Sequence, residues 1–528
     1  MDTQNLIAPQ KYNITHELEK FKGEARTAIH WIDADGNRQT LSYKHLIEQM
    51  NQYANALVSF GLEKGDRVLI MVPRVPEAYK VYLACIKAGV VPIACSEMLR
   101  ASDIEYRINH SEAKAVIVYK GLTEEFDKIV LPYDALKCKL IIGEDKNTWK
   151  RLDLSANEKA LTFETADTSR DDIAFLSYTS GTTGKPKAAV HAHSWGYAHI
   201  RTASTKWLGV KEGDLVWATA APGWQKWIWS PFLSTIMLGA TAFVYHGPFN
   251  ADKYLTLLQD EKINVLCCTP TEYRIMAKTE NIERFNLSSL RSAVSAGEPL
   301  NRPVIDTFLN HFNIKVRDGY GQTENTLLVG TLEDMEQRSG SMGKPTPGNI
   351  VKIIDNFGNE APIGEVGDIA VHKSCPALFK EYYKDHERTQ AAFRGDWYIT
   401  GDQARADEDG YFWYEGRNDD IIISSGYTIG PFEVEDALNK HESVQECAVV
   451  ASPHETRGSI VKAYIVLKES YEVKDELQLI NELQEHVKLL TAPYKYPRLI
   501  EFTKELPKTT SGKIRRVELR EKEQELAK

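Results

Sequence analysis

The stretch Tyr178-Thr-Ser-Gly-Thr-Thr-Gly-Lys-Pro-Lys187 follows closely after the apolar run Ile173-Ala-Phe-Leu176. Gly181 and Gly184 lack a Cβ and let backbone amides turn toward an anion, while the threonines, the serine and the lysines add further donors. We therefore predict a loop that binds a polyphosphate. It differs from loops of the GxxxxGKS/T type, because two residues separate its glycines and Pro186 follows the lysine. The alternative interpretation is an ordinary surface turn rich in Ser, Thr and Gly.

The length and composition indicate a multidomain globular protein. A chain of 528 residues exceeds one compact core, so at least two domains are expected. Apolar residues make up 42% and charged residues 26%, which excludes a disordered chain and a disulfide scaffold. The formal charge of -10, with no long basic run outside the C-terminal tail, argues against a nucleic-acid partner.

The N-terminus and the cysteines indicate the compartment. The N-terminal Met-Asp-Thr-Gln-Asn-Leu-Ile lacks the basic and apolar regions of a secretory signal. No apolar run approaches the ~20 residues that cross a bilayer. The seven cysteines form no Cys-x-x-Cys pair and no zinc-like spacing with histidine, so reduced structural thiols are expected. We therefore expect a cytoplasmic protein without a transmembrane segment.

The first part of the chain alternates helical and strand-like patterns. Apolar residues recur at helical spacing over residues 41–57 and 78–88, whereas residues 67–72, 90–94 and 115–119 are short apolar runs. This alternation predicts an α/β fold, in which helices cover largely parallel sheets. After about residue 340, short strands with frequent glycines predict a small, partly antiparallel β unit.

A second domain is predicted after the polar, turn-prone segment Gly416-Arg-Asn-Asp-Asp420. Beyond it a fresh α+β pattern begins, with helical or strand-like spacing over residues 434–440, 444–451, 461–467 and 477–490. We place a large N-terminal domain at residues 1–417 and a smaller, mobile α+β domain at residues 418–528.

A second motif, Asp318-Gly-Tyr-Gly-Gln-Thr-Glu324, combines an aromatic ring, two glycines, a hydroxyl and a carboxylate. Tyr320 could stack on a purine, Thr323 could donate to a phosphate, and Glu324 could hold Mg²⁺ against phosphate oxygens. Taken alone, the segment could equally be a turn at the end of a strand.

Two further segments could complete a nucleotide site. Tyr398-Ile-Thr-Gly-Asp402 ends a strand-like run in a carboxylate suited to two ribose hydroxyls, although a surface turn is an equal interpretation. Pro507-Lys-Thr-Thr-Ser-Gly-Lys-Ile-Arg-Arg516 presents Lys513 from a glycine turn in a basic tail, which by itself could be only a solvated face.

Together and in this order, these motifs resemble the adenylate-forming superfamily of acyl-CoA synthetases, adenylation domains and beetle luciferases. The resemblance covers essentially the whole chain and includes Ser295-Ala-Gly-Glu-Pro-Leu300, Gly364-Glu-Val-Gly-Asp368 and Ser424-Ser-Gly-Tyr-Thr-Ile-Gly-Pro431. The segments Ala221-Pro-Gly-Trp224 and Gly430-Pro-Phe-Glu-Val-Glu435 look most like acetyl- and medium-chain acyl-CoA synthetases, including those that act on short branched acids.

The resemblance implies a two-step reaction with ATP, Mg²⁺ and coenzyme A as cofactors. A small-molecule carboxylic acid attacks the α-phosphate to give an acyl-adenylate, and the CoA thiol then displaces AMP. Carried over by motif, Lys513 would bridge the α-phosphate and the attacking carboxylate, Thr323 would bind the α-phosphate, and Glu324 would bind the metal. The phosphate contacts are assigned to Thr179, Ser180, Gly181, Thr182, Thr183, Gly184, Lys185 and Lys187. The nucleoside contacts are assigned to Gly297, Glu298, Pro299, Asp318, Gly319, Tyr320, Gly321, Asp402 and Arg417.

The resemblance also implies domain movement, because Lys513 lies in the small domain and most ATP contacts lie in the large one. The hinge is expected at Asp419, and Gly426 is expected to line the pantetheine tunnel. One departure is Thr428, where relatives usually carry an arginine. It removes a cation that would face phosphate.

The acyl pocket is expected at Gly223-Trp-Gln-Lys-Trp-Ile-Trp229, which carries three tryptophans and a lysine in seven positions. Trp224 and Trp229 could wall an apolar pocket and Lys226 could lie near the polar end of the substrate. Ordinary core tryptophans beside a surface lysine are the alternative. A bulky cap at Trp229 would favour short, and also branched, chains.

The leading hypothesis is therefore an AMP-forming acyl-CoA synthetase for a short- to medium-chain fatty acid. One enzymatic alternative activates an aromatic acid or passes its adenylate to a free carrier protein. A third hypothesis, motivated by Thr428, is a nucleotide- or acyl-CoA-binding protein without turnover, which would release no pyrophosphate with any acid.

Overall fold

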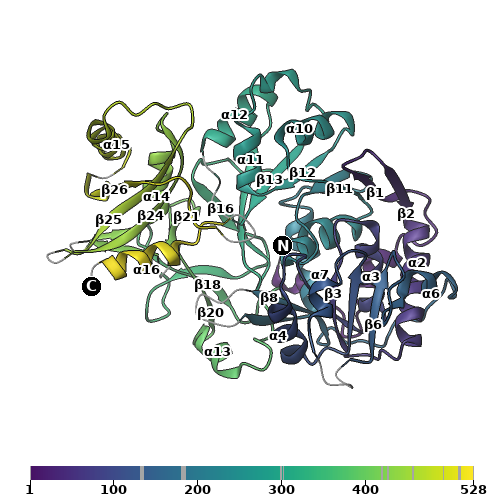
Figure 1. The fold of residues 1–528 in the computed structure, drawn as a ribbon. Helices are drawn as coiled ribbons and strands as arrows, with labels where there is room; N and C mark the ends of the chain where they lie inside the picture. Colours follow the sequence, from purple (N-terminus) through teal and green to yellow (C-terminus); the bar gives the residue numbers. More distant parts are fainter. Residues whose placement is uncertain are drawn as a thin grey trace.

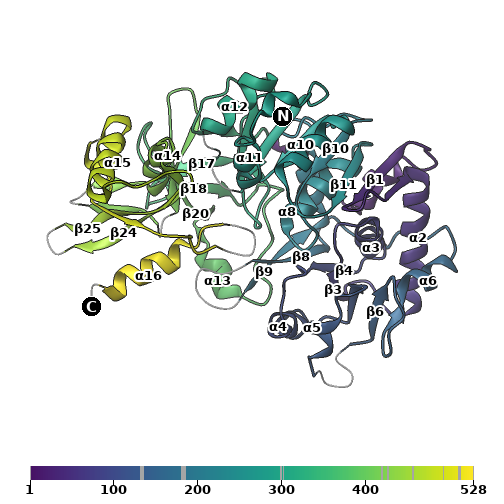
Figure 2. The same ribbon diagram turned by 45° about the horizontal axis from the view of Figure 1, so that its top comes forward.

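The computed structural model describes residues 2–130, 136–179, 186–297, 300, 302–417, 420–424, 427–454, 457–491, 493–508 and 513–526. Within these residues the strands form three sheets of seven, fourteen and five strands. Figure 1 shows the chain colours running from the N-terminal sheet at one end of the molecule to the C-terminal elements at the other. The 45° turn of Figure 2 keeps the same separation.

The seven-stranded sheet has the order β7-β6-β5-β3-β4-β8-β9 and is parallel except for β9, which runs antiparallel to β8. Its inner strands β3 and β5 are apolar apart from Arg67 and the Tyr119 hydroxyl at their ends, as expected of strands covered on both faces. The strands are β3 (Arg67–Met71), β4 (Val91–Ala94), β5 (Ala115–Tyr119), β6 (Cys138–Ile142), β7 (Lys150–Arg151), β8 (Ile173–Thr179) and β9 (Lys187–Ala192).

Helices beside this sheet begin at residues with clear local causes. The Ser42 side chain caps α2 by accepting from the His45 amide, and Pro76 occupies the first turn of α3, where no amide donor is needed. The helices of the first half are α1 (Thr15–Glu19), α2 (Tyr43–Ser59), α3 (Pro76–Lys87), α4 (Ala101–Ser111), α5 (Glu124–Asp127), α6 (Leu152–Asn157), α7 (His193–His199), the π-helix η2 (Ile200–Ser204), α8 (Gln225–Trp227), the π-helix η3 (Ile228–Leu233) and α9 (Ser234–Ile236).

The fourteen-stranded sheet joins a parallel part to an antiparallel part. Strands β1, β11, β10, β12, β13 and β14 are parallel, whereas the path from β14 to β17 is antiparallel. The strands are β1 (Thr27–Asp33), β2 (Arg38–Ser42), β10 (Leu215–Ala218), β11 (Thr241–His246), β12 (Val265–Cys268), β13 (Ser292–Ala296), β14 (Val316–Gly321), β15 (Leu327–Gly330), β16 (Ser341–Pro345), β17 (Val351–Ile354), β18 (Gly367–His372), β19 (Phe393–Arg394), β20 (Trp397–Ala406) and β21 (Phe412–Arg417). Helices α10 (Ala251–Asp260), α11 (Pro270–Met276) and α12 (Arg302–Phe312) lie beside it, and α13 is His386–Ala391. The predicted α/β fold with a partly antiparallel unit after residue 340 is confirmed.

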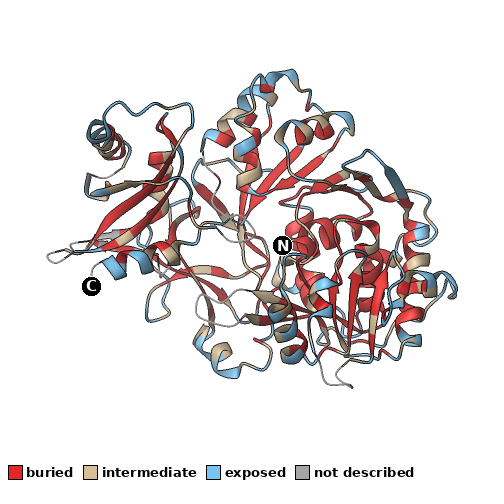
Figure 3. Cartoon of the chain, in the orientation of Figure 1, coloured by how far each residue is buried: buried red, intermediate tan, exposed pale blue. Residues whose placement is uncertain are grey.

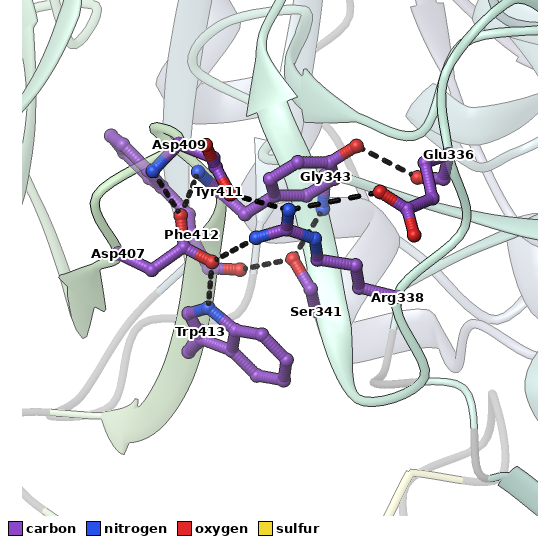
Figure 4. A network of polar contacts seen from close by, with 9 residues as sticks. All are labelled: Glu336, Arg338, Ser341, Gly343, Asp407, Asp409, Tyr411, Phe412 and Trp413. Atoms are coloured by element: carbon purple, nitrogen blue, oxygen red, sulfur yellow. Dashed lines mark hydrogen bonds and ion pairs between the residues drawn. The ribbon is translucent and has the colours of Figure 1, made fainter.

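The antiparallel part is anchored by a polar network around Arg338, which Figure 4 shows. The Arg338 guanidinium pairs with Asp407 at 2.8 Å and with Asp409 at 2.5 Å, and it lies 4.2 Å from the centre of the Tyr411 ring. The Trp413 indole donates to Asp407 at 3.1 Å. These contacts hold the segment before β16 against the β20–β21 turn, and so support the hairpin whose other end carries Asp402 and Arg417.

The C-terminal unit has its own sheet and its own apolar cores. Its elements are β22 (Ile422–Ser424), β23 (Tyr427–Ile429), α14 (Pro431–Asn439), β24 (Val444–His454), β25 (Gly458–Leu467), α15 (Glu476–Leu490), β26 (Leu499–Phe502) and α16 (Arg516–Leu526). The α+β pattern is therefore as expected. The boundary between residues 417 and 418 stays a prediction, because residues 418 and 419 lie outside the described part.

Buried residues concentrate on the strands and on the helix faces that cover them (Figure 3). All seven cysteines are buried and none is in a disulfide. In the part of the chain that the structure describes, no helix combines the length and the apolar character that a membrane span requires.

Candidate active site

The predicted phosphate loop joins the two C-terminal strands of the seven-stranded sheet. Thr179 at the end of β8 pairs with Lys187 at the start of β9. The pairing of β8 with β9 therefore ends at these two residues, which flank the predicted loop. The predicted contacts of Ser180, Gly181, Thr182, Thr183, Gly184 and Lys185 lie outside the described residues.

Helix α4 holds both sides of this hairpin, which the sequence did not suggest. The Tyr106 hydroxyl donates to the Pro186 carbonyl at 2.9 Å, and His110 Nδ1 lies 2.7 Å from the Tyr178 hydroxyl. The Arg107 guanidinium lies 5.1 Å from the centre of the Tyr178 ring. Burial, helped by Lys384, lowers the pKa of His110, so the ring is neutral at physiological pH.

A cavity of about 220 Å³ opens beside these contacts and beside Lys187. Its walls are formed by Tyr106, His110, Pro186, Lys187, Ala188, Tyr383, Asp385 and Arg388.

Lys187 and Glu324 meet at the centre of the site. Lys187 Nζ lies 2.8 Å from Glu324 Oε1, and the carboxylate is only 6% exposed. Tyr382 completes the contact, because its hydroxyl donates to Glu324 Oε1 at 2.8 Å and accepts from Lys187 at 2.6 Å. Burial and the Glu324 charge raise the pKa of Tyr382, which keeps the phenol protonated as a donor. The sequence predicted the first two residues and missed Tyr382.

The surroundings of Glu324 are compatible with the predicted metal contact. A buried carboxylate at the phosphate loop suits Mg²⁺, which commonly uses one or two carboxylates together with substrate phosphates. The side-chain contacts of Glu324 with Lys187 and Tyr382 are both made through Oε1. Among the described residues, no cluster of three or more His, Cys, Asp or Glu side chains could cage a metal alone. The site therefore fits a metal ion that arrives with ATP.

Asp402 holds the hydroxyl end of Tyr320 on the predicted nucleoside side of the site. Its Oδ2 atom accepts from the Tyr320 hydroxyl at 2.6 Å and from Gln322 at 2.7 Å. Its Oδ1 atom accepts from Tyr414 at 3.2 Å, and Arg417 lies 3.9 Å away. Burial raises the pKa of Asp402, although these partners oppose the shift. The carboxylate therefore fixes the ring that was predicted to stack on the purine.

Trp207 packs against the start of the second motif, a contact that the sequence did not predict. The Trp207 indole donates to the Asp318 carbonyl at 3.0 Å, and a Cβ on Gly319 would lie 2.5 Å from the Trp207 ring. Only glycine fits at that position. The Asp318 carboxylate accepts from the amides of Leu300 and Gly319, and burial raises its pKa to about 7.

Lys513 reaches the large domain from the C-terminal unit. A Cβ built on Gly297 would lie 3.9 Å from Lys513 Nζ, so the predicted catalytic lysine meets the predicted adenine-site segment. The helix after it, α16, is fixed by Arg516, which donates to both carboxylate oxygens of Glu435 at 3.0 and 2.6 Å. Such a two-point contact sets the direction from which Lys513 approaches.

The predicted acyl pocket lies against the second motif. A Cβ on Gly321 would lie 2.7 Å from the Trp229 ring, so the indole packs directly on the motif backbone. Trp224 precedes α8, and Lys226 lies 5.3 Å from the centre of the Trp207 ring. The Lys226 ammonium and the Trp229 indole nitrogen are buried without a hydrogen-bond partner in the described structure. Lys226 is thus not a simple surface lysine.

Most of the remaining predicted residues lie in the undescribed part of the chain. Glu298, Pro299, Asp419 and Gly426 lie outside the described residues. Thr428 belongs to β23, where its backbone pairs with Ile423.

The contact of Lys187 with Glu324 and the approach of Lys513 to Gly297 are the arrangement expected of an adenylate-forming enzyme. Residues 18–383 match the family described as AMP-binding enzyme, and residues 433–513 match the AMP-binding enzyme C-terminal domain. The chain belongs to the AMP-binding enzyme family, which confirms the resemblance.

Similar proteins are named as ligases of acids and CoA. The chain is 61% identical to the uncharacterized acyl-CoA ligase YtcI of Bacillus subtilis (strain 168), over 99% of this chain and 98% of that protein. It is 40% identical to the human mitochondrial acyl-coenzyme A synthetase ACSM3, over 95% of this chain and 86% of that protein. Among solved structures, an anthranilate CoA ligase, AuaEII, in complex with anthranoyl-AMP has a TM-score of 0.91 and 29% identity, with full coverage of both chains.

Proposed function

We propose that this protein is an AMP-forming acyl-CoA synthetase that activates a short- to medium-chain fatty acid, straight or branched. The observation that carries the proposal is the approach of Lys513 to Gly297, because it brings a cation from the C-terminal unit to the predicted nucleotide site. The similarity to acyl-CoA ligases and synthetases along nearly the whole chain supports the same activity.

In the first half-reaction, a carboxylate oxygen of the acid attacks the α-phosphorus of ATP. A new P–O bond forms, the bond to pyrophosphate breaks, and an acyl-adenylate results. Two anions approach each other in this step, so cations must be held ready where charge develops. Lys513 is proposed to neutralise the carboxylate and the α-phosphate, and Lys187 the outer phosphates. Mg²⁺, when bound beside Glu324, would neutralise further charge on the phosphate oxygens.

In the second half-reaction, the CoA thiol loses its proton and attacks the acyl carbonyl. A C–S bond forms, the bond between the acyl carbon and the phosphate oxygen breaks, and AMP leaves. Lys513 has no proposed role in this step, because the adenylate is already formed. We therefore propose that the C-terminal unit moves between the steps, with Asp419 as the pivot and Gly426 beside the pantetheine chain.

The acid preference is proposed from the wall formed by Trp229. The indole is 5% exposed and rests on Gly321, one residue beyond Tyr320, so it occupies space next to the reaction centre. Each buried methylene contributes roughly 0.8 kcal/mol to binding, so a wall at this place disfavours chains that cannot pass it. The position of Trp229 supports short and branched acids.

An aromatic-acid CoA ligase is the second candidate, and the likeness of the fold to the anthranilate CoA ligase favours it. A benzoate CoA ligase from Burkholderia xenovorans LB400 is also similar, with a TM-score of 0.84 and 29% identity. The higher identities to acyl-CoA synthetases make the fatty-acid proposal the stronger one.

The test is pyrophosphate release and thioester formation across a panel of acids, with and without CoA. We expect pyrophosphate with butyrate, isobutyrate, hexanoate and octanoate, and acyl-CoA by mass spectrometry only when CoA is present. Activity confined to benzoate-type acids would support the second candidate. Absence of pyrophosphate with every acid would refute the proposal.

A further inference from the structure

His199 lies buried between the proposed acyl pocket and the turn that carries Thr323 and Glu324. It is the last residue of α7 and is 0% exposed. One ring nitrogen, Nδ1, lies 2.7 Å from the Thr326 hydroxyl oxygen. The other, Nε2, lies 3.1 Å from the Trp229 carbonyl oxygen. A single side chain thus touches the pocket wall and the adenylation turn.

The donor directions of these two bonds follow from the chemistry of the partners. A carbonyl oxygen only accepts, so the contact with Trp229 assigns the hydrogen to Nε2, and the Ser234 hydroxyl lies 3.3 Å from the same nitrogen. Burial lowers the pKa of His199 to about 3, and nearby His191 and Lys226 disfavour the cation further. The ring is therefore neutral, Nδ1 is an acceptor, and the Thr326 hydroxyl donates to it. His199 therefore accepts a hydrogen bond from Thr326, donates one to Trp229, and so links the two residues.

Gly321 packs against the same two residues, Thr326 and Trp229. A Cβ on Gly321 would lie 2.1 Å from the Thr326 carbonyl oxygen and 2.7 Å from the Trp229 ring. Gly321 is therefore held between the turn on one side and the indole on the other. His199 binds both of those neighbours, so His199, Trp229, Gly321 and Thr326 form one closed set of contacts.

Ring packing prevents the imidazole from tilting out of this set. His199 stacks on Trp195 with ring centres 5.0 Å apart and an angle of 13° between the planes. On the other side its centre is 5.2 Å from that of Trp229. The Trp195 indole in turn donates to the Asn325 carbonyl at 3.0 Å, in the same turn as Thr326. Both hydrogen bonds of His199 are thus held in fixed directions.

We propose that His199 is a specificity-determining positioning residue, which holds Trp229 against Gly321 and so sets the depth of the acyl pocket. Through Thr326 it also links the position of that wall to the turn carrying Thr323 and Glu324. An acid that fits the pocket leaves the contacts among His199, Trp229, Gly321 and Thr326 unchanged. An acid that displaces Trp229 strains the turn that carries Thr323 and Glu324. The inference rests on the proposed function and deepens it by naming a residue that selects chain length without touching the acid.

The experiment compares three variants with the wild type. His199→Phe keeps a ring but loses both hydrogen bonds, while His199→Gln keeps an amide donor and a carbonyl acceptor. Thr326→Val keeps the side-chain shape and removes the hydroxyl that contacts His199 at 2.7 Å and Thr202 at 3.4 Å. Tyr43→Phe is the matched control, because it also removes a buried hydroxyl, one that donates to the carbonyls of Ile236 and Ala240 and contacts neither Trp229 nor Thr326.

The readouts are kcat/KM for butyrate, hexanoate and octanoate, and the KM for ATP from pyrophosphate release. In His199→Phe, we expect the octanoate-to-butyrate ratio of kcat/KM to rise about 10-fold and the KM for ATP to rise several-fold. His199→Gln should restore much of the wild-type ratio. Thr326→Val should raise the KM for ATP and change the octanoate-to-butyrate ratio of kcat/KM by less. It tests the inference even if His199→Phe fails to fold. Tyr43→Phe should lose stability without changing either readout.

The outcomes separate this inference from the proposed function. Wild-type turnover with an unchanged chain-length ratio in both His199 variants would overturn the inference alone. A shift of the same size in Tyr43→Phe would also overturn it, because general loosening would then explain the effect. Absence of any thioester from the wild type would refute the proposed function, and the inference with it.

Discussion

Lys187 and Glu324 form an ion pair, with Nζ and Oε1 2.8 Å apart, that joins the phosphate hairpin to the turn after β14. Lys187 belongs to β9 of the seven-stranded sheet, and Glu324 lies between β14 and β15 of the fourteen-stranded sheet, so the pair connects the two sheets at the proposed ATP site. The same carboxylate is the proposed metal contact. If Glu324 held a metal ion as proposed, the pair would have to open when ATP binds, which would free Lys187 for the phosphates.

We predict that Glu324→Gln lowers the rate of adenylate formation by roughly 100-fold and raises the Mg²⁺ concentration for half-maximal rate. A neutral amide keeps the acceptor for Tyr382 and loses the charge that favours a metal ion. Pyrophosphate release measured over a magnesium titration gives both quantities. An unchanged magnesium dependence would assign Glu324 to holding Lys187 and Tyr382 alone.

Tyr106→Phe should raise the KM for ATP several-fold and leave thermal stability nearly unchanged. The change removes only the hydroxyl that donates to Pro186 at 2.9 Å, so the helix α4 stays packed while one side of the phosphate hairpin is released. Tyr411→Phe is the control, because it removes a hydroxyl that also donates to a carbonyl, that of Glu336 at 2.8 Å, outside the hairpin. Equal effects of the two variants on the KM for ATP would contradict the role of α4.

Lys513→Ala should reduce adenylate formation on the order of 100-fold or more and leave acyl transfer from a supplied acyl-adenylate to CoA largely intact. The reason is that two anions meet only in the first half-reaction, and only there does the transition state gain from a cation. The half-reactions are measured separately, as pyrophosphate release and as thioester formed from synthetic acyl-adenylate. Equal loss in both would make Lys513 a structural residue.

The sequence predicted strands of the seven-stranded sheet because parallel strands covered by helices are largely apolar, and β3 and β5 fall on the predicted runs 67–72 and 115–119. It also placed Lys187, Glu324, Tyr320 and Asp402 in one site through the order of motifs. Tyr382, Trp207 and His199 were missed because they lie in no motif, and their partners are 58, 111 and 127 residues away in the chain. Contacts between such distant residues depend on packing of complete layers, which local periodicity does not specify.

Arg338→Ala should lower the free energy of unfolding by about 1 kcal/mol at neutral pH, since the arginine joins Asp407, Asp409 and the Tyr411 ring. Burial raises the pKa of Asp407, but hydrogen bonds from the Tyr411 amide, Trp413 and Arg338 outweigh it and leave the pKa below its usual value. The stabilisation is thus present above the unfolded pKa of about 3.9 and is lost as pH falls through the lower folded value. Urea unfolding of both proteins at neutral pH and at about pH 3 should show the difference shrinking in acid. A constant difference would attribute the effect to packing on Tyr411.

Trp229→Gly should move the optimum of kcat/KM toward longer acids and weaken selection for short branched ones. The indole rests on Gly321 and is nearly buried, so its removal opens space that several methylenes can fill. At roughly 0.8 kcal/mol for each buried methylene, the gain is up to a few-fold for each added carbon until the new space is filled. The measurement is kcat/KM for a graded series of straight and branched acids in both proteins, with the KM for ATP recorded alongside.

Trp217→Phe is a suitable control, because Trp217 is a buried tryptophan of β10 that packs on Tyr254 and makes no contact with Gly321. If the ranking of acids is unchanged and only stability declines, Trp229 is a core residue, and the wall of the pocket must be sought near Cys267, whose thiol lies 3.8 Å from the Ser230 hydroxyl.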